Sequence, residues 1–333
     1  MSSPGSAPAR STDVLLLVSP APPTAVLGNG VTAQRWSNIL HTLGQESQTT
    51  QRYTGGRYDA LIALHAGKSA DSIRAFRDAN PRAPIVIALT GTDLYPDLAS
   101  TGVDPAVLDA ADRFVVLQTR GLDQLSSHLR NRARVIVQSM PPVERVPARE
   151  DVFEVAFLAH LRPVKDPLLP ALATRSLSEG SRIRVTHVGA GLDADLAAQA
   201  KLESQDNQRY DWVGELPRQE ALQVLARSRL MVLTSRHEGG ANVVSEALAA
   251  GVPVIASAIP GSEGLLGEDY PGYFPVGDAP ALADCLHAAE TDRDGYYSEL
   301  SRHCAALRSM VEPHREIEAW ATLLGELGLP VAR

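Results

Sequence analysis

Two series of short apolar runs, each alternating with stretches of helical periodicity, constrain the fold of this sequence more than any other feature. The runs are aliphatic and β-branched and are bounded by turn residues, which is typical of strands buried on both faces of a parallel sheet. Each series therefore predicts one sheet assembled from βαβ units. The first comprises Val14–Val18, Ala60–Leu64, Ile85–Leu89, Phe114–Leu117 and Val135–Val137; the second comprises Val155–Leu158, Ile183–Val188, Tyr210–Val213, Leu230–Leu233, Val252–Ala256 and Gly272–Phe274.

Helices are expected between these strands and at the C-terminus. The candidates are Thr32–Leu43, Ser69–Asn80, Pro105–Ala111, Thr119–Leu129 and a final amphipathic segment, Pro313–Leu327. A stretch rich in proline and charge, Met140–Asp151, separates the two series and is typical of a linker. We therefore predict an α/β protein of two Rossmann-like lobes whose parallel sheets face each other across a cleft. Ligands of such folds bind beyond the carboxyl ends of the strands.

The overall composition argues against several classes of function. The chain has 333 residues, enough for two lobes with cores of their own, and its formal charge of −8 disfavours nucleic acid or an anionic membrane as a partner. No apolar run approaches the ~18–20 residues that span a bilayer. Cys285 and Cys304 are too few for a disulfide framework or a zinc cluster, so we expect a cytoplasmic protein with reduced thiols. Residues 1–12, rich in Ser, Pro, Ala and Gly, are predicted to be a disordered tail.

Glu238 and Glu246 mark the most informative motif of the second lobe. Seven residues separate them, in a turn and helix that follow the predicted strand Leu230–Leu233. The helix N-terminus offers unpaired backbone N–H groups that can hold an anion, and carboxylates accept hydrogen bonds from sugar hydroxyls. This combination indicates a site for a nucleotide sugar.

Arg162 and Lys165 follow the first strand of the second lobe and are expected to converge on one point. Two fixed cations can neutralise a departing diphosphate, the role that a metal ion has in other transferases. The alternative, a pair of solvated loop charges, is the commoner case in proteins. Their placement opposite a second anion site in the same lobe favours the functional interpretation.

Two glycine and aspartate motifs in the second lobe have ordinary explanations. Gly189 lies in a partial G-x-G-x-x-A pattern, which we interpret as a tight turn between a strand and a helix, and we include it among the expected donor-binding residues. Asp193 and Asp195 resemble a metal-binding pair, but they stand at a predicted helix start, where Asp is favoured as a capping residue. No other cluster of His, Cys and carboxylate residues indicates a metal site.

Three loops of the first lobe follow strands and should open onto the same cleft. The first contains glycines, which let the backbone approach a ligand closely, and leads into a helix that carries Arg35. In the second, His65 stands beside Lys68 directly after a strand, a better position for function than most histidines have. The candidate ligand-binding residues of these loops are Gly28, Asn29, Gly30, Arg35, His65, Lys68, Thr90 and Gly91. A flexible loop without function is an equally good interpretation of the first one.

The second lobe resembles the family-4 retaining glycosyltransferases of the GT-B fold, and the likeness extends over roughly residues 13–325. It rests on the Arg162/Lys165 pair, the two glutamates and the sequence Gly251-Val252-Pro253-Val254. The resemblance implies that Glu246 holds the ribose of a nucleotide and that Glu238 lies beside the transferred sugar. It also implies that sugar and phosphate contact the backbone of Gly239, Gly240, Ala241 and Asn242. Gly240-Ala241-Asn242 departs from the family pattern, because many members have an aromatic residue followed by Gly here.

The first lobe is similar to the selenosugar synthases of selenoneine biosynthesis. The likeness rests on three runs, Gly28–Trp36, Ala63–Ala70 and Ala88–Tyr95. It implies a metal-independent, retaining hexosyltransferase that uses no cofactor. Its expected substrates are selenophosphate and a UDP-sugar that carries N-acetylglucosamine or glucose. The expected catalytic residues are Arg162, Lys165, Glu238 and His65. Selenium is already a strong nucleophile at neutral pH, so no general base is required.

The resemblance implies that the acceptor and the donor bind to different segments of the chain. Residues 13–147 are expected to form the acceptor lobe, 148–312 the donor lobe, and 313–333 a helix that packs back toward the first lobe. Three alternatives stay open. They are a glycosyltransferase with another small anionic or thiol acceptor, a UDP-sugar epimerase, and a non-catalytic nucleotide-sugar binder. Nothing in the sequence indicates an oligomeric state.

Overall fold

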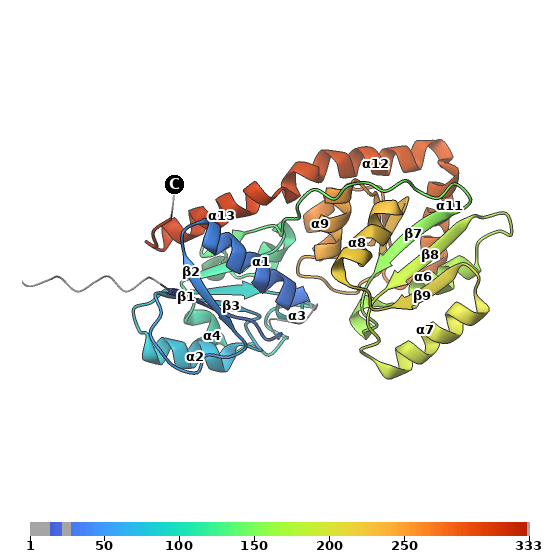
Figure 1. Ribbon diagram of the computed structural model, residues 1–333. Helices are drawn as coiled ribbons and strands as arrows, with labels where there is room; N and C mark the ends of the chain where they lie inside the picture. Colours follow the sequence, from blue (N-terminus) through green and yellow to red (C-terminus); the bar gives the residue numbers. More distant parts are fainter. Residues whose placement is uncertain (1–13, 22–27, 332–333) are drawn as a thin grey trace, which may run out of the picture.

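A computed structural model describes residues 14–21 and 28–331 of the chain. The predicted tail, residues 1–12, lies outside the described residues. The described chain forms two six-stranded sheets in which every strand pairs parallel to its neighbours, with strand orders β2-β1-β3-β4-β5-β6 and β12-β11-β10-β7-β8-β9. Figure 1 shows the two lobes side by side, each with helices on the faces of its sheet. The predicted two-lobe α/β architecture is confirmed.

The first sheet contains the five predicted strands and one that the sequence analysis missed. The missed strand is β2 (Glu46–Thr50), which is polar and only partly buried because it forms the edge of the sheet. The central strands are completely buried, as expected for a sheet covered on both faces. The remaining strands are β1 (Val14–Val18), β3 (Ala60–Leu64), β4 (Ile85–Leu89), β5 (Arg113–Val116) and β6 (Ala133–Val135).

Short helices and turns connect the strands of the first lobe. The predicted helix at Thr119–Leu129 is instead a 3-10 turn, Thr119–Gln124, followed by a separate short helix, α5 (Ser127–Arg130). The other helices are α1 (Gly28–Thr42), α2 (Ala70–Ala79), α3 (Gly91–Leu94) and α4 (Pro105–Asp109).

The second lobe follows the same plan, and its strands agree with the predicted ones to within two residues. Its strands are β7 (Phe153–Leu158), β8 (Ile183–Val188), β9 (Tyr210–Gly214), β10 (Leu230–Leu233), β11 (Val254–Ser257) and β12 (Tyr273–Phe274). Its helices are α6 (Leu169–Arg175), α7 (Ala194–Asp206), α8 (Arg218–Arg227), α9 (Asn242–Ala250), α10 (Pro260–Leu266), α11 (Ala279–Thr291) and α12 (Tyr296–Leu307). None of the helices among the described residues is long and apolar enough to span a membrane.

The last helix, α13 (Pro313–Glu326), leaves the second lobe and lies along the first, as Figure 1 shows. Trp320 of this helix packs edge-on against Trp36 of α1, with ring centroids 4.8 Å apart, and both rings are fully buried. The buried Glu316 accepts hydrogen bonds from the indole N–H of Trp36 (2.8 Å) and from the backbone N–H and hydroxyl of Ser139 (2.8 and 2.6 Å). The chain thus crosses between the lobes twice, through the linker and through α13.

Candidate functional site

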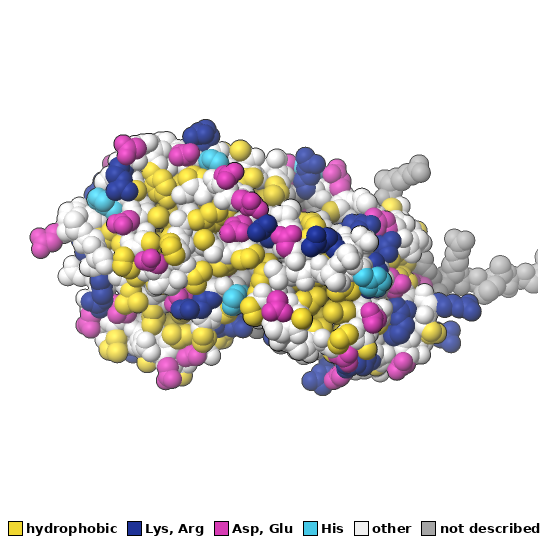
Figure 2. All heavy atoms as spheres, turned by 180° about the vertical axis from the view of Figure 1, so that it is seen from behind, with side chains coloured by type: hydrophobic (Ala, Val, Ile, Leu, Met, Phe, Trp, Pro, Cys, Tyr) yellow, Lys and Arg dark blue, Asp and Glu magenta, His cyan; other side chains and the backbone are white. Residues whose placement is uncertain are grey.

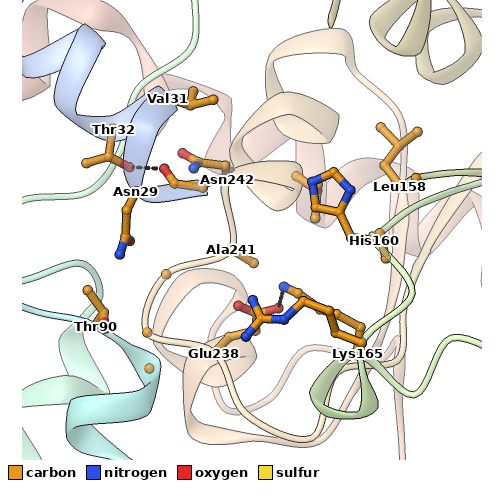
Figure 3. Close-up of a pocket in the computed structure, with 18 of the residues that line it drawn as sticks. Asn29, Val31, Thr32, Thr90, Leu158, His160, Lys165, Glu238, Ala241 and Asn242 are labelled. Atoms are coloured by element: carbon orange, nitrogen blue, oxygen red, sulfur yellow. Dashed lines mark hydrogen bonds and ion pairs between the residues drawn. The ribbon is translucent and has the colours of Figure 1, made fainter. Parts of the chain in front are cut away.

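A cavity of about 370 Å³ lies between the lobes, at the carboxyl ends of strands from both sheets. Figure 2 shows the two lobes from behind, with side chains of both charge signs interspersed over that face. Figure 3 shows residues of α1, of the loop after β4, of the loop after β7 and of the turn before α9 around one space. The cavity therefore lies where the topology of two facing parallel sheets predicts a ligand site.

Most of the candidate residues from the sequence line this cavity. From the first lobe these are Gly28, Asn29, His65, Lys68, Thr90 and Gly91; from the second they are Arg162, Lys165, Gly189, Glu238, Gly239, Gly240, Ala241, Asn242 and Glu246. The structure does not bring Gly30 and Arg35 to the cavity wall. Arg35 instead forms an ion pair with Glu316 (3.0 Å) and donates a hydrogen bond to Asn242 (3.2 Å) behind the wall.

Lys165 is held in the cavity wall by Glu238, which is held in turn by Ser235. It ends a short 3-10 turn, Pro163–Lys165, and its ammonium group forms an ion pair with Glu238, which Figure 3 shows as a dashed line. The hydroxyl of Ser235 donates to the same carboxylate oxygen of Glu238 (2.6 Å). Arg162, just before the turn, is exposed at the rim. One cation is therefore fixed in place, and a second lies three residues away.

Glu246 lies on α9 and is 6% exposed, with its carboxylate facing the cavity. It forms an ion pair with Arg218 (2.8 Å), the first residue of α8. Arg218 also lines the cavity, and the sequence analysis missed it. The position of Arg218 in the sequence is a signal that could have identified it. It follows strand β9 after a short loop, and the predicted site residues follow other strands in the same way.

Glycines bring the two lobes into direct contact beside the cavity. A side chain on Gly91, in the loop after β4, would place its Cβ 2.7 Å from the backbone nitrogen of Gly239. A Cβ on Gly239 would in turn collide with the backbone of Gly91, and one on Gly240 with the side chain of Leu117. Real Cβ atoms do not approach backbone atoms so closely. The closed arrangement of the lobes therefore requires glycine at these positions.

In the first lobe, one buried carboxylate joins the loops after β3 and β4. Asp93 is fully buried, and its Oδ1 atom lies 2.7 Å from Nδ1 of His65. Burial acts to raise the pKa of Asp93. The hydrogen bond to His65, the charge of that imidazole and the amides of Thr90 and Gly67 outweigh this effect, so the pKa lies below its ordinary value. Asp93 is therefore ionised at neutral pH.

The hydrogen bonds of Asp193 show whether it caps a helix or belongs to a metal-binding pair. Asp193 accepts hydrogen bonds from the backbone N–H groups of Asp195 (3.1 Å) and Leu196 (3.0 Å), so it caps the N-terminus of α7 as predicted. Within the described residues, no group of three or more His, Cys, Asp or Glu side chains is placed to hold a metal ion.

The comparisons with known proteins agree with this geometry. Residues 143–306, the greater part of the second lobe, match the family of glycosyl transferases group 1. Sucrose-phosphate synthase from Thermosynechococcus elongatus has the same fold, with a TM-score of 0.77 and 16% identity over 96% of this chain and 99% of that one. Anabaena Alr3699/HepE in complex with UDP gives a TM-score of 0.74 and 15% identity over 94% of this chain and 100% of that one. No curated protein matches the sequence significantly.

The GT-B fold, the cavity between its lobes and this family match together indicate the class of the protein. Residues 143–306 have the sequence features of the group 1 glycosyltransferases, and the described chain has the GT-B fold.

Proposed function

We propose that this enzyme transfers a hexose from a UDP-sugar to selenophosphate, with retention of configuration and without a metal ion. The arrangement that supports the proposal is the fixed Lys165–Glu238 pair beside the Gly239–Asn242 turn, directly across the cavity from the loops that carry Lys68 and Thr90. The groups on one side of the cavity suit a nucleoside diphosphate, and the groups on the other side suit a small anion.

The donor is assigned to the second lobe. Glu246 receives the ribose hydroxyls there, Arg162 and Lys165 neutralise the diphosphate, and the backbone of Gly239–Asn242 contacts sugar and phosphate. Among the structures of similar fold, one of HepE is in complex with UDP-glucose, and that of the pneumococcal O-GlcNAc transferase GtfA is in complex with UDP and GlcNAc. Glucose and N-acetylglucosamine are therefore the sugars to test first.

The acceptor is assigned to the first lobe, where Gly28, Asn29, Lys68, Thr90 and Gly91 line the cavity. In the proposed reaction the bond between the anomeric carbon and the diphosphate oxygen breaks, and its electron pair leaves with UDP. A selenium lone pair forms the new bond to the same carbon. The charge that develops on the leaving group is the charge that Arg162 and Lys165 stabilise. Hydrolysis of the phosphorus–selenium bond of this product then yields the selenosugar and phosphate.

The direct test is to incubate the protein with UDP-N-acetylglucosamine or UDP-glucose and selenophosphate, and to identify the products by mass spectrometry. A selenium-containing hexose together with UDP supports the proposal. Transfer to thiols or polyols but not to selenophosphate would assign a different acceptor. An altered UDP-sugar formed from the donor alone would indicate an epimerase, and donor binding without any product would indicate a sensor.

Replacing Glu246 with Gln is expected to raise the KM for the UDP-sugar about tenfold or more. The carboxylate is proposed to accept charge-assisted hydrogen bonds from the ribose, which are stronger than those that a neutral amide accepts. Steady-state kinetics with each substrate varied in turn measures the effect, and the KM for the acceptor should stay unchanged. The opposite pattern, with only the acceptor KM raised, would reverse the assignment of the lobes. Glu203→Gln on α7, whose partner is Arg175, is a matched control outside the cavity.

A further inference from the structure

The side chain of Asp93 is buried behind the cavity wall that lies opposite the proposed donor site. Its Oδ2 atom accepts hydrogen bonds from the backbone and hydroxyl of Thr90 (2.9 and 3.1 Å) and from the backbone of Ala66 (3.2 Å). Its Oδ1 atom accepts from the backbone of Gly67 (3.1 Å) and contacts His65. Capping of the short helix α3 accounts for the bonds to Thr90, but not for those to Ala66, Gly67 and His65. Asp93 thus fixes two loops relative to each other.

His65 is held in a defined orientation by this carboxylate. Its backbone has a φ of 69°, in the left-handed region that residues with side chains rarely adopt. Nδ1 lies 2.7 Å from Asp93 and 3.3 Å from the backbone nitrogen of Lys68, and it cannot donate to the first and accept from the second at once. The shorter contact is to an ionised carboxylate and is the stronger one, so Nδ1 carries a proton. The other ring nitrogen, Nε2, then points toward Thr92.

Nε2 of His65 contacts the hydroxyl oxygen of Thr92 at 2.9 Å, and both residues line the cavity. When the imidazole is neutral, Nε2 accepts the hydroxyl proton, and Thr92 presents only lone pairs to a ligand. When the imidazole is protonated, Nε2 donates to the hydroxyl oxygen, and the hydroxyl proton is free to point into the cavity. The protonation of His65 therefore sets whether Thr92 is an acceptor or a donor toward a ligand.

We propose that Thr92 is a specificity-determining residue for an anionic acceptor, donating a hydrogen bond to it while His65 is protonated and Asp93 holds the imidazole in place. The inference rests on the proposed function insofar as the acceptor is an anion bound in the first lobe. Asp93 is a positioning residue, because it acts through His65 and Thr92. The other titratable groups along this wall are Lys68 of the same loop and, from the second lobe, His237 and Glu238. Lys68 favours an anion there, and Glu238 is paired with Lys165.

A pair of variants at Thr92 provides the test. Thr92 is exposed, so neither variant should disturb folding. Thr92→Val keeps the shape of the side chain and removes the hydroxyl, and we expect the KM for selenophosphate to rise about tenfold while the KM for the UDP-sugar stays unchanged. Thr92→Ser retains the hydroxyl and should restore a value near that of the wild type. An unchanged acceptor KM in Thr92→Val, with an active wild type, would overturn the inference.

A comparison of single and double variants separates this role from a merely structural one. Asp93→Asn should raise the acceptor KM, because its side chain no longer holds the imidazole of His65 toward Thr92. In the Thr92→Val background the same change should add no further rise in the acceptor KM. An equal rise in both backgrounds would contradict the mechanism.

A binding experiment distinguishes failure of this inference from failure of the proposed reaction. Calorimetry of inorganic phosphate added to the UDP-loaded protein requires no turnover. Phosphate binding that is about tenfold weaker in Thr92→Val than in the wild type supports the anion site even if selenophosphate is not the substrate. Equal phosphate binding by the wild type and Thr92→Val overturns the inference, whatever the reaction is.

Discussion

Replacing Lys165 with Ala is expected to lower the turnover number by about 10²–10³-fold, because a preorganised charge at a leaving group contributes on this scale. The ammonium group is fixed by Glu238, which is itself held by Ser235, so the cation is already placed before the substrate binds. It interacts most strongly with the charge that develops as the bond to UDP breaks. The KM for the donor should therefore change much less than the turnover number. Single-turnover kinetics with saturating donor measures the chemical step directly.

Two further variants make this result specific. Lys201 on α7 is exposed and does not line the cavity, so the turnover of Lys201→Ala should match that of the wild type. Lys165→Arg keeps the positive charge but not the compact ammonium group, and it should recover only part of the lost activity. Full activity in Lys165→Ala would show that this residue does not stabilise the leaving group.

The sheets could be predicted from the sequence because their strands are buried on both faces and therefore form continuous apolar runs. The edge strand β2 could not, because its residues are polar and its existence depends on pairing with β1. The site could be predicted in outline for a related reason. In parallel sheets the carboxyl ends of the strands meet at one edge, so loops distant in sequence converge once the topology is known.

The errors in the predicted site come from partners that are distant in sequence. Arg35 was expected to contact the acceptor, but its guanidinium contacts Glu316, 281 residues away on α13, and Asn242. Asp93 belongs to a loop that was expected to face the cleft, but the role of its carboxylate was not predicted, because only the folded chain brings it against His65. The role of Gly91 as a point of contact between the lobes was missed as well, since it depends on how closely the second lobe approaches.

Replacing Gly91 with Ala is expected to lower turnover by about 100-fold while leaving the fold of each lobe intact. The added Cβ would lie 2.7 Å from the backbone nitrogen of Gly239. The atoms it meets belong to the backbone, so they cannot move aside as the end of a flexible side chain could. The lobes must then separate, which displaces the acceptor loops from the donor. A misplacement of about 1 Å between reacting groups can cost on this order in rate. Because Gly91 belongs to the first lobe, UDP affinity measured by calorimetry should stay near that of the wild type.

Small-angle X-ray scattering of the UDP-bound protein should show a larger radius of gyration for Gly91→Ala than for the wild type. Gly180→Ala is a matched control, because a Cβ at that position meets nothing within 4 Å. Its turnover and dimensions should equal those of the wild type. Gly239→Ala tests the same contact from the other lobe, where the new Cβ would collide with the backbone of Gly91. If Gly91→Ala kept wild-type turnover and compactness, the close approach of the two loops would not be required for the reaction, and a more open arrangement would have to be the active one.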